Sequence, residues 1–387
     1  MALGPATALG FARFSYALLL PAMARSLRLD YFQAGALNVT NAAGYLMGAL
    51  TVNKVSLRYG HKKVFIFSMA LIVVFLSLVG VTDSYTTILV LRAISGYFGA
   101  LIFISGGVLL AHHLHRIGEC GKSTSLALGL YYGGAGVGTA ISGFGLPYLL
   151  NLVGDKNWAV GWYCLSTLAF ISLIAALFAL KDLTDPKYVS TEQNTHANFA
   201  KLSHIWPSIL SYGLFGAGYI SFMTFIVAFF HSEGKSGFFV SFFYLILGTA
   251  SFFSAYVWSK PLSRLPGGFG LASTYLVVAV GSILPIILSG AIGSSLSGFL
   301  FGLGLMASST ALIKVSQRNL SQSIITKALG VSTAAMALGQ IAGPLLTGTI
   351  SDHYGVASGM LASTAVLVLA TLIAIFQRDV KGTTSYS

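Results

Sequence analysis

The sequence predicts an all-α membrane protein with twelve transmembrane helices, arranged as two parallel six-helix bundles. Of its 387 residues, 55% are hydrophobic and only 8% are charged, whereas a soluble domain carries about 25% charged residues. Burial in one soluble core does not account for this deficit, but lipid as the solvent does. Runs of about 20 apolar residues, enough for a helix to cross the hydrocarbon core, recur between polar breaks along the whole chain.

Each predicted span is justified by its apolar length and by the polar or turn-forming residues that end it. The spans are 3–24, 33–54, 64–82, 86–111, 123–150, 158–180, 205–230, 237–258, 269–290, 294–316, 326–350 and 356–377. The first six are ended by Arg25–Asp30, Arg58–Lys63, Asp83–Ser84, His112–Lys122, Asp155–Asn157 and the polar stretch 181–203. The turn between the ninth and tenth spans, Gly290–Ser295, carries no charge.

The cations are distributed unevenly between the two sides of the predicted membrane. Sixteen of the 22 Lys and Arg residues fall in even-numbered connections and the C-terminal tail, and four fall in odd-numbered connections. The positive-inside rule therefore predicts both termini in the cytoplasm, as in a bacterial inner-membrane protein. Because the charges lie in short loops and do not cluster on one face, the net charge of +12 does not indicate a nucleic-acid partner.

The two halves of the sequence echo each other at an offset of 201–203 residues. The segment 127–129 (ALG) recurs at 328–330, and 95–97 (SGY) recurs as 297–299 (SGF). A parallel duplication of six spans places a solute site between the halves, near the bilayer midplane. The predicted organisation is an N-terminal bundle at 1–180, a cytoplasmic linker at 181–204 and, at 205–387, a C-terminal bundle with a short tail.

Two cations lie inside the predicted spans, Arg13 and Arg92, whereas none of the ten Asp and Glu residues does. An unpaired arginine at membrane depth costs about 2.5–3.5 kcal/mol by insertion scales, so it normally faces a wet cavity or a ligand. We expect the missing anion to arrive as the solute, held near the midplane by Arg13 through its planar fork. The alternative is that these arginines only lock packing, by donating to backbone carbonyls or tying neighbouring helices.

Uncharged polar side chains supply the other candidate contacts. Asn38, Asn41 and Tyr45 fall at i, i+3 and i+7, which places them on one stripe of the second span. Such a stripe faces protein or water, and interhelical hydrogen bonds are the alternative to solute binding. Further candidates for the solute site are Tyr16, Tyr131, Tyr132, Tyr212, Tyr219 and Gln340.

The turn after the second span reads Val55-Ser-Leu-Arg58-Tyr-Gly60-His-Lys62-Lys63. With the two sets of six spans and Arg92 in the fourth, it resembles the major facilitator superfamily, although Leu57 replaces the aspartate of the family's D-R-x-G-R-K loop. The resemblance implies that two sets of residues take part in conformational change. For the glycines, the alternative is that they only allow close helix packing. The sets are Arg58, Gly60, Lys62 and Lys63 in the turn, and Gly96, Gly133, Gly138, Gly339, Gly343 and Pro344 in the spans.

Within that superfamily, the opening Gly10-Phe-Ala-Arg13-Phe-Ser-Tyr16-Ala-Leu-Leu-Leu-Pro21-Ala-Met is similar to the YbfB/YjiJ-type permeases. The resemblance implies a monomeric secondary transporter working by rocker-switch alternating access. Together with the arginines it predicts a small organic solute, anionic or zwitterionic. Two alternatives stay open, which are an efflux pump for hydrophobic or cationic compounds and a non-transporting membrane receptor or scaffold.

The sequence carries no motif of an enzyme or of ATP-driven transport. It lacks a phosphate-binding glycine loop ending in Lys-Ser/Thr and an HExxH motif, so we expect no enzymatic activity and no cofactor. His112, His113 and His115 are neighbours in sequence without converging partners, so we expect no metal site. A proton is a possible coupling ion, but with no carboxylate inside a span, uniport is equally open.

Overall fold

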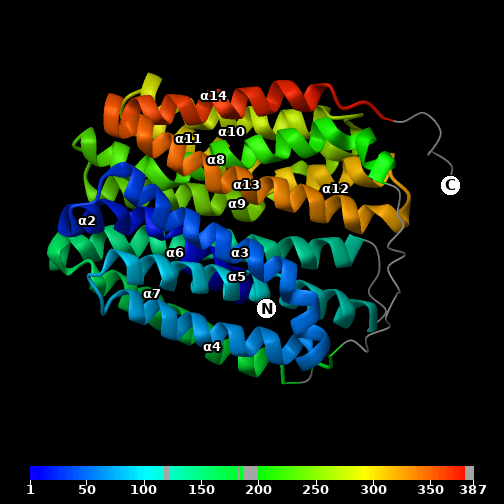
Figure 1. Ribbon diagram of the computed structural model, residues 1–387, viewed down its shortest axis with the longest axis horizontal. Helices are drawn as coiled ribbons and strands as arrows, with labels where there is room; N and C mark the ends of the chain where they lie inside the picture. The colour runs from blue at the N-terminus through cyan, green and yellow to red at the C-terminus, as the bar shows by residue number, and fades with distance from the viewer. Residues whose placement is uncertain (117–121, 182, 186–198, 380–387) are drawn as a thin grey trace.

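The protein is an elongated bundle of long helices that run roughly parallel to one another (Figure 1). The computed structural model describes residues 1–116, 122–181, 183–185 and 199–379, and these contain no strand. Most of the predicted linker, the end of the tail from residue 380, and Glu119 and Cys120 lie outside the described residues. Twelve helical rods cross the bundle, which is the all-α membrane fold expected from the sequence.

The first six rods come from residues 3–179. The first rod consists of α1 (Leu3–Pro5), η1 (Ala6–Phe14) and α2 (Tyr16–Leu27). The other five are α3 (Tyr31–Tyr59), α4 (His61–Val79), α5 (Tyr85–Arg116), α6 (Lys122–Val153) and α7 (Ala159–Ala179), with the short η2 (Asp155–Asn157) before α7.

The last six rods come from residues 206–375 and follow the short η3 (Phe199–Ile205). They are α8 (Trp206–Ser232), α9 (Gly237–Arg264), α10 (Phe269–Ile287), α11 (Ala291–Leu305) with α12 (Ala307–Asn319), α13 (Gln322–Tyr354) and α14 (Val356–Ile375). The predicted tenth span is therefore two helices that meet at Met306. The turn that precedes this span, which carries no charged residue, is formed at Gly290 with φ 106°.

Eleven of the rods are long and apolar enough to span a membrane by length and composition. The exception is α3, a 29-residue helix that is as long as its neighbours but more polar. Gln33, Asn38 and Asn41 lower the hydropathy of its first half. Most helices also extend a few residues beyond their predicted apolar spans, since backbone hydrogen bonding continues past the point where apolar side chains stop.

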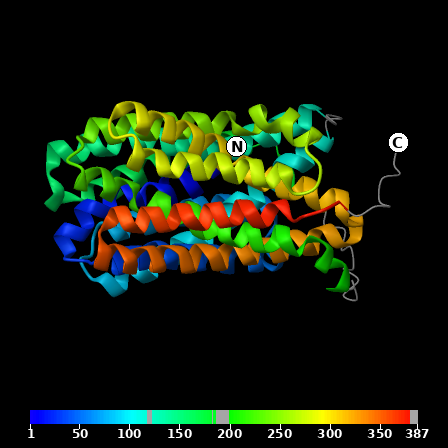
Figure 2. The same cartoon turned by 90° about the horizontal axis from the view of Figure 1, so that it is seen from above.

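Most helix packing occurs among the first six rods or among the last six. Within the first set α5 packs against α3 and α4, and α4 packs against α7; within the last set α8 packs against α13 and α14, as Figure 2 shows from above. The main pairs that join the two sets are α6 with α9, α3 with α13 and α2 with α8. Between α6 and α9 the backbones approach closely because Gly136 and Gly248 face each other, and a Cβ on either would meet the other's carbonyl oxygen.

The two ends of the bundle differ in charge. The basic end holds the turn at 58–63, the last turn of α5 and the turn after α9, and α14 ends there at the right of Figure 1. The Asp352 end holds the turns after α2, α6, α8 and α13. Here the two sets of rods are tied together, because the Asp352 carboxylate accepts hydrogen bonds from the backbone N–H groups of Tyr31 (2.7 Å) and Phe32 (3.0 Å) at the start of α3.

Candidate solute-binding site

The first rod is not a regular α-helix around Arg13. Residues Ala6–Phe14 form a nine-residue π-helix, η1, whereas π-helical geometry occurs mostly as single turns and often at functional sites. The wide turns are covered by α6, where Gly138 packs against the carbonyl of Ala6. At the end of η1, the hydroxyl of Ser15 donates to the carbonyl of Gly10 at 2.7 Å. The segment is therefore held by contacts from other parts of the chain as well as by its own backbone bonds.

Arg13 lies in the last turn of η1, with only 4% of its surface exposed. Its Nη2 donates to Oε1 of Gln340 on α13 at 2.7 Å, and Nε2 of Gln340 donates to the hydroxyl of Tyr219 on α8 at 2.6 Å. The guanidinium also lies 5.3 Å from the ring centre of Tyr45 on α3, and its buried Nε has no hydrogen-bond partner. Arg13 thus reaches across to the second set of helices but meets a neutral amide there instead of a carboxylate.

Two predicted tyrosines lie beside Arg13 or its amide partner, Tyr45 from the first set of helices and Tyr219 from the second. Tyr132 and Tyr212 are each linked to one of them through a single phenylalanine ring. The Tyr212 hydroxyl lies 3.0 Å from the Ser309 hydroxyl. Tyr132 is the most exposed of the four, at 38%. The structure therefore brings together Arg13, Gln340 and four of the tyrosines that the sequence suggested.

Arg92 occupies a different environment, in which its guanidinium is completely buried. Nη1 donates to the carbonyl of Ala12 at 2.5 Å, Nε to the carbonyl of Leu37 at 3.4 Å and Nη2 to Oδ1 of Asn38 at 3.5 Å. The rings of Tyr16 and Trp162 lie 4.7 and 5.5 Å from its Cζ. Protein oxygens and aromatic faces surround this cation, and one of those oxygens belongs to the residue just before Arg13.

The predicted polar stripe on α3 divides between these two arginines. Tyr45 lies beside Arg13, whereas Asn41 donates to the carbonyl of Arg92 at 3.1 Å and leaves its buried Oδ1 without a partner. Asn38 donates to the Thr224 hydroxyl on α8 at 2.6 Å, which is a further hydrogen bond between the two sets of helices. The spacing of the three residues therefore predicts correctly that their side chains lie on the interior face of α3, but not which residues they contact.

Two predicted tyrosines have hydroxyls that bond outside the Arg13 group, although the ring of Tyr131 lies 5.1 Å from that of Tyr132. The Tyr16 hydroxyl donates to the carbonyl of Ala34 at 2.7 Å, and that of Tyr131 donates to the carbonyl of Phe103 at 3.0 Å. Both side chains are fully buried. Because their hydroxyls are satisfied by backbone oxygens within the first set of helices, the structure does not place them where a solute would reach them.

The basic turn is anchored by a residue that the sequence did not suggest. The backbone N–H of Lys62 donates to the Asp185 carboxylate at 2.7 Å, and Lys62 Nζ donates to the carbonyl of Leu183 at 2.9 Å. Gly60 adopts φ 84° beside the same carboxylate. Asp185 thus supplies an anion at the start of α4, where Leu57 leaves the family's loop without one.

The remaining residues of the predicted conformational set lie at close helix contacts or on the surface. Arg58 and Lys63 are exposed, with the Arg58 guanidinium 5.4 Å from the Tyr59 ring centre. Each of the others faces a specific neighbour: Gly96 the carbonyl of Asn41, Gly133 the ring of Phe252, Gly339 and Gly343 the carbonyls of Gly213 and Ala217, and Pro344, through its carbonyl, Gly35. Gly133 and Pro344 lie between the two sets of helices, and the other glycines, Gly138 included, lie within one set.

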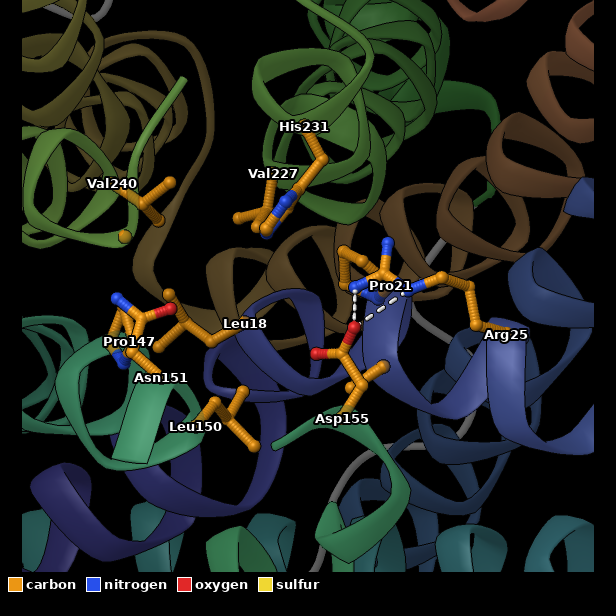
Figure 3. Close-up of a pocket in the computed structure, with 12 residues that line it drawn as sticks. Leu18, Pro21, Arg25, Pro147, Leu150, Asn151, Asp155, Val227, His231 and Val240 are labelled. Atoms are coloured by element: carbon orange, nitrogen blue, oxygen red, sulfur yellow. Dashed lines mark hydrogen bonds and ion pairs between the residues drawn. The ribbon is translucent and has the colours of Figure 1, made fainter. Parts of the chain in front are cut away.

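A small cavity of about 20 Å³ lies near the Asp352 end, between α2, α6, α8 and α9. Figure 3 shows the Arg25–Asp155 ion pair on one wall, with Nη2 and Oδ2 2.6 Å apart, and His231 on the opposite side. A cavity of this size holds about one water molecule. It is too small for an organic solute in this conformation. Among the described residues, no group of three His, Cys, Asp or Glu side chains converges as a metal site would require.

Comparison with known proteins gives one family and one fold. The family model described as "Uncharacterised MFS-type transporter YbfB" matches residues 5–375. No curated protein matches the chain.

Similar solved structures include a bacterial homologue of the human lysosomal transporter Spinster, in an inward-facing and unoccupied conformation, with 15% identity and a TM-score of 0.70 over 96% of this chain and 95% of that one. The nucleoside transporter NupG has 16% identity and a TM-score of 0.70 over 97% and 98%. A peptide transporter POT in complex with sulfate has 14% identity and a TM-score of 0.72 over 97% and 92%. At these identities the structures show a shared fold.

Proposed function

The chain belongs to the YbfB-type branch of the major facilitator superfamily, and from this premise we propose that it moves a small organic anion or zwitterion across the membrane by rocker-switch alternating access. It is a multi-pass membrane transporter and not an enzyme, as its family and structural relatives are. The nature of the solute rests on one observation. Arg13, buried where the two sets of helices meet, has a neutral amide as its hydrogen-bond partner and leaves its Nε free.

An anionic group is a better partner for Arg13 than the amide of Gln340. A guanidinium can bind a carboxylate through two parallel hydrogen bonds between opposite charges, whereas the amide oxygen of Gln340 accepts one bond and carries no charge. The described carboxylates cannot provide such a partner, because all lie at or beyond helix ends: Asp30, Asp83, Asp155, Asp185, Glu233, Asp352 and Asp379. A solute carboxylate would therefore displace Gln340 and use both Nη2 and Nε.

Alternating access follows from the way in which both sets of helices meet at this arginine. We propose that residues 1–180 and 205–387 rock as two bundles joined by the linker at 181–204. Arg13, Tyr45 and Tyr132 would contact the solute from the first bundle, and Tyr212, Tyr219 and Gln340 from the second. In this conformation Gln340 connects Arg13 directly to the second bundle. Solute binding would break that hydrogen bond, and the solute itself would then contact both bundles.

The remaining predicted residues support this site from outside it. We propose that Arg92 is a positioning residue, which holds the carbonyl of Ala12 and so fixes the π-helical turn that presents Arg13. Tyr16, Tyr131, Asn38 and Asn41 stabilise the packing around it. Gly133 and Pro344 lie on surfaces that must slide as the bundles rock, and the turn at 58–63 moves with the linker through Asp185.

The charge asymmetry of the bundle supports an orientation for the transport cycle. With the basic end in the cytoplasm of a bacterial inner membrane, the contacts of Asp352 would close the outer side, and the conformation would face the cytoplasm. No described carboxylate lies deep in a span to carry a coupling proton. Uniport by a monomer, or coupling through the solute's own charge, therefore fits the described residues better than a buried protonation site.

A ligand screen on the purified protein tests this proposal. Carboxylates, phosphates, amino acids and amphipathic cations are compared for thermal stabilisation of the wild type and of Arg13→Ala. A ligand at one hundred times its Kd stabilises by about 2.7 kcal/mol. We expect stabilisation by certain carboxylates and its loss in Arg13→Ala. Stabilisation by cations alone, equal in both proteins, would instead identify an efflux pump for cationic compounds.

The orientation has its own test. In a Cys120→Ser/Cys164→Ser background, a membrane-impermeant thiol reagent should label Lys63→Cys in inside-out vesicles and not in intact cells. Labelling in intact cells would reverse the proposed orientation without affecting the solute site.

A further inference from the structure

Aromatic rings line the Arg13 site from the first set of helices. Phe103 lies 6.4 Å from Tyr45 and 5.0 Å from Tyr132, measured between ring centroids, and Tyr131 lies 5.1 Å from Tyr132. The rings come from α3, α5 and α6, so three different helices build one continuous aromatic wall. The most exposed member of this wall is Tyr132, at 38%, and Tyr45 is half-buried.

A second aromatic wall lies in the other set of helices. Phe215 stacks on Tyr219 with centroids 5.4 Å apart and an interplanar angle of 29°, and on Tyr275 at 4.5 Å and 15°. Tyr212 continues the stack at 6.5 Å and 10° from Phe215. The Tyr219 hydroxyl accepts a hydrogen bond from Gln340, which in turn accepts one from Arg13, so this wall reaches the guanidinium from the second set of helices.

Arg13 lies between the two walls and is the single charge that faces both of them among the described residues. Its guanidinium lies over the ring of Tyr45 and is joined to Tyr219 through Gln340. Arg92 is not available to a second anionic group, because carbonyl oxygens and rings occupy its surroundings. One free cation neutralises one negative charge, which disfavours di- and tricarboxylates and phosphate dianions as solutes.

The same charge balance disfavours zwitterions. An ammonium group carried into this site would need a carboxylate, and the described carboxylates all lie at or beyond helix ends. The part of the solute beyond its carboxylate therefore faces rings and phenol hydroxyls. Flat π-systems pack against such rings in offset or edge-to-face geometry more favourably than their buried area alone would give.

We infer that the solute is an aromatic monocarboxylate, whose carboxylate binds Nη2 and Nε of Arg13 while its ring inserts between the Tyr45–Tyr132 wall and the Tyr212–Tyr219 wall. This inference rests on the proposed transport function and narrows it from anions and zwitterions to one chemical class. The phenol hydroxyls are placed to accept or donate hydrogen bonds to polar ring substituents, so hydroxylated aromatic acids belong to the same class.

Matched pairs of probes separate the contribution of the ring from that of the charge. Benzoate and 3-phenylpropionate are each compared with their cyclohexyl counterparts, which keep the carboxylate but lack a π face, and with benzamide, which keeps the ring but lacks the charge. Dissociation constants come from the concentration dependence of thermal stabilisation of the full chain in detergent. We expect at least one aromatic acid to bind about tenfold more tightly than its cyclohexyl counterpart and benzamide to bind more weakly than benzoate.

Variants assign the effect to the two walls. Tyr132→Leu should reduce the affinity for the aromatic acid at least fivefold and change that for the cyclohexyl acid less than twofold. Arg13→Ala should abolish binding of both acids. Tyr148→Leu is the matched control, since it makes the same change on the same helix at a site that is 66% exposed, outside either wall. The melting temperatures of the unliganded variants report whether each one is folded.

Failure of this inference differs from failure of the proposed function. Equal affinities for each aromatic acid and its cyclohexyl counterpart, both lost in Arg13→Ala, would overturn the aromatic class and leave anion transport intact. Binding of carboxylates that Arg13→Ala does not weaken, or binding of benzamide equal to that of benzoate, would overturn the anion proposal and the aromatic class with it.

Discussion

Arg13 and Arg92 carry the same side chain into the same part of the bundle, yet their surroundings differ. Arg92 meets three protein oxygens and two aromatic faces, all within the first set of helices. Arg13 meets one amide oxygen from the other set and one ring, and its Nε stays unpartnered. A buried cation whose hydrogen-bond donors are all paired within its own bundle stabilises the fold. A buried cation with an unpaired donor at the boundary between the bundles can still form new hydrogen bonds to a ligand.

The largest effect should come from removing the satisfied cation. Arg92→Met removes the charged hydrogen bonds from Arg92 to the carbonyls of Ala12 and Leu37 in an apolar environment, and hydrogen bonds to charged groups are worth about 1.5–3 kcal/mol each. We expect a loss of about 3 kcal/mol in stability, measured as a lower melting temperature and lower yield in detergent. Arg92→Lys, which keeps one donor but not the fork, should fall in between. A wild-type melting temperature for Arg92→Met would show that Arg92 does not stabilise the fold.

The converse change tests the other half of the comparison. Arg13→Ala removes a side chain with few partners, so we expect the unliganded stability to change by less than about 1 kcal/mol. Carboxylate binding should weaken at least tenfold, equivalent to about 1.4 kcal/mol or more. If Arg13→Ala destabilises the protein as strongly as Arg92→Met, the two arginines are equivalent and the distinction is wrong.

A third variant supplies the anion that the Arg13 site lacks. Gln340→Glu places a carboxylate within reach of Nη2, and we expect it to raise the stability of the empty protein by about 1 kcal/mol because charge-assisted bonds are stronger. It should also block carboxylate binding, measured by the ligand-induced thermal shift. Gln340→Met, similar in size but uncharged, is the control and should retain binding. Retained binding in Gln340→Glu would mean that the solute does not bind at Arg13.

The smallest effect concerns the link at the Asp352 end. Asp352→Ala removes an exposed carboxylate that caps α3 from the other set of helices, and exposed charged contacts are worth about 0.2–1 kcal/mol. In the Cys120→Ser/Cys164→Ser background, labelling of Val227→Cys by an impermeant thiol reagent should become about twofold to fivefold faster. Asp83→Ala, at the same end but in a turn of the first set, should not change the rate. An unchanged rate in Asp352→Ala would show that other contacts hold this end closed.

The fold could be predicted from the sequence because lipid imposes a simple rule on helix length and polarity. All twelve rods were predicted, α3 among them, although Gln33 and two asparagines lower its hydropathy. The break at Met306 was not predicted, because the residues around it are as apolar and helix-compatible as their neighbours. The two-bundle division and the orientation stay predictions that the proposed labelling and transport experiments address.

The site was predictable in its composition but not in its assignment of partners. The two arginines look alike in sequence because the groups that distinguish them are backbone carbonyls, such as those of Ala12 and Leu37, which no residue type reveals. The π-helix gave no signal either, since Ala6–Phe14 reads as an ordinary apolar helix. Asp185 was missed because it lies over 120 residues from the turn that it caps.

The π-helical stretch also makes the length of the first rod a functional property. Each residue advances an α-helix by about 100°. Deleting one residue between Ala6 and Ala12 would rotate everything before it by roughly a quarter of a turn relative to Arg13, unless the whole stretch gave up its π-helical hydrogen bonds. The carbonyl of Ala6 would then turn away from Gly138. We expect natural selection to remove such deletions as strictly as it removes replacements of Arg13, so that homologous chains should align through this stretch without gaps.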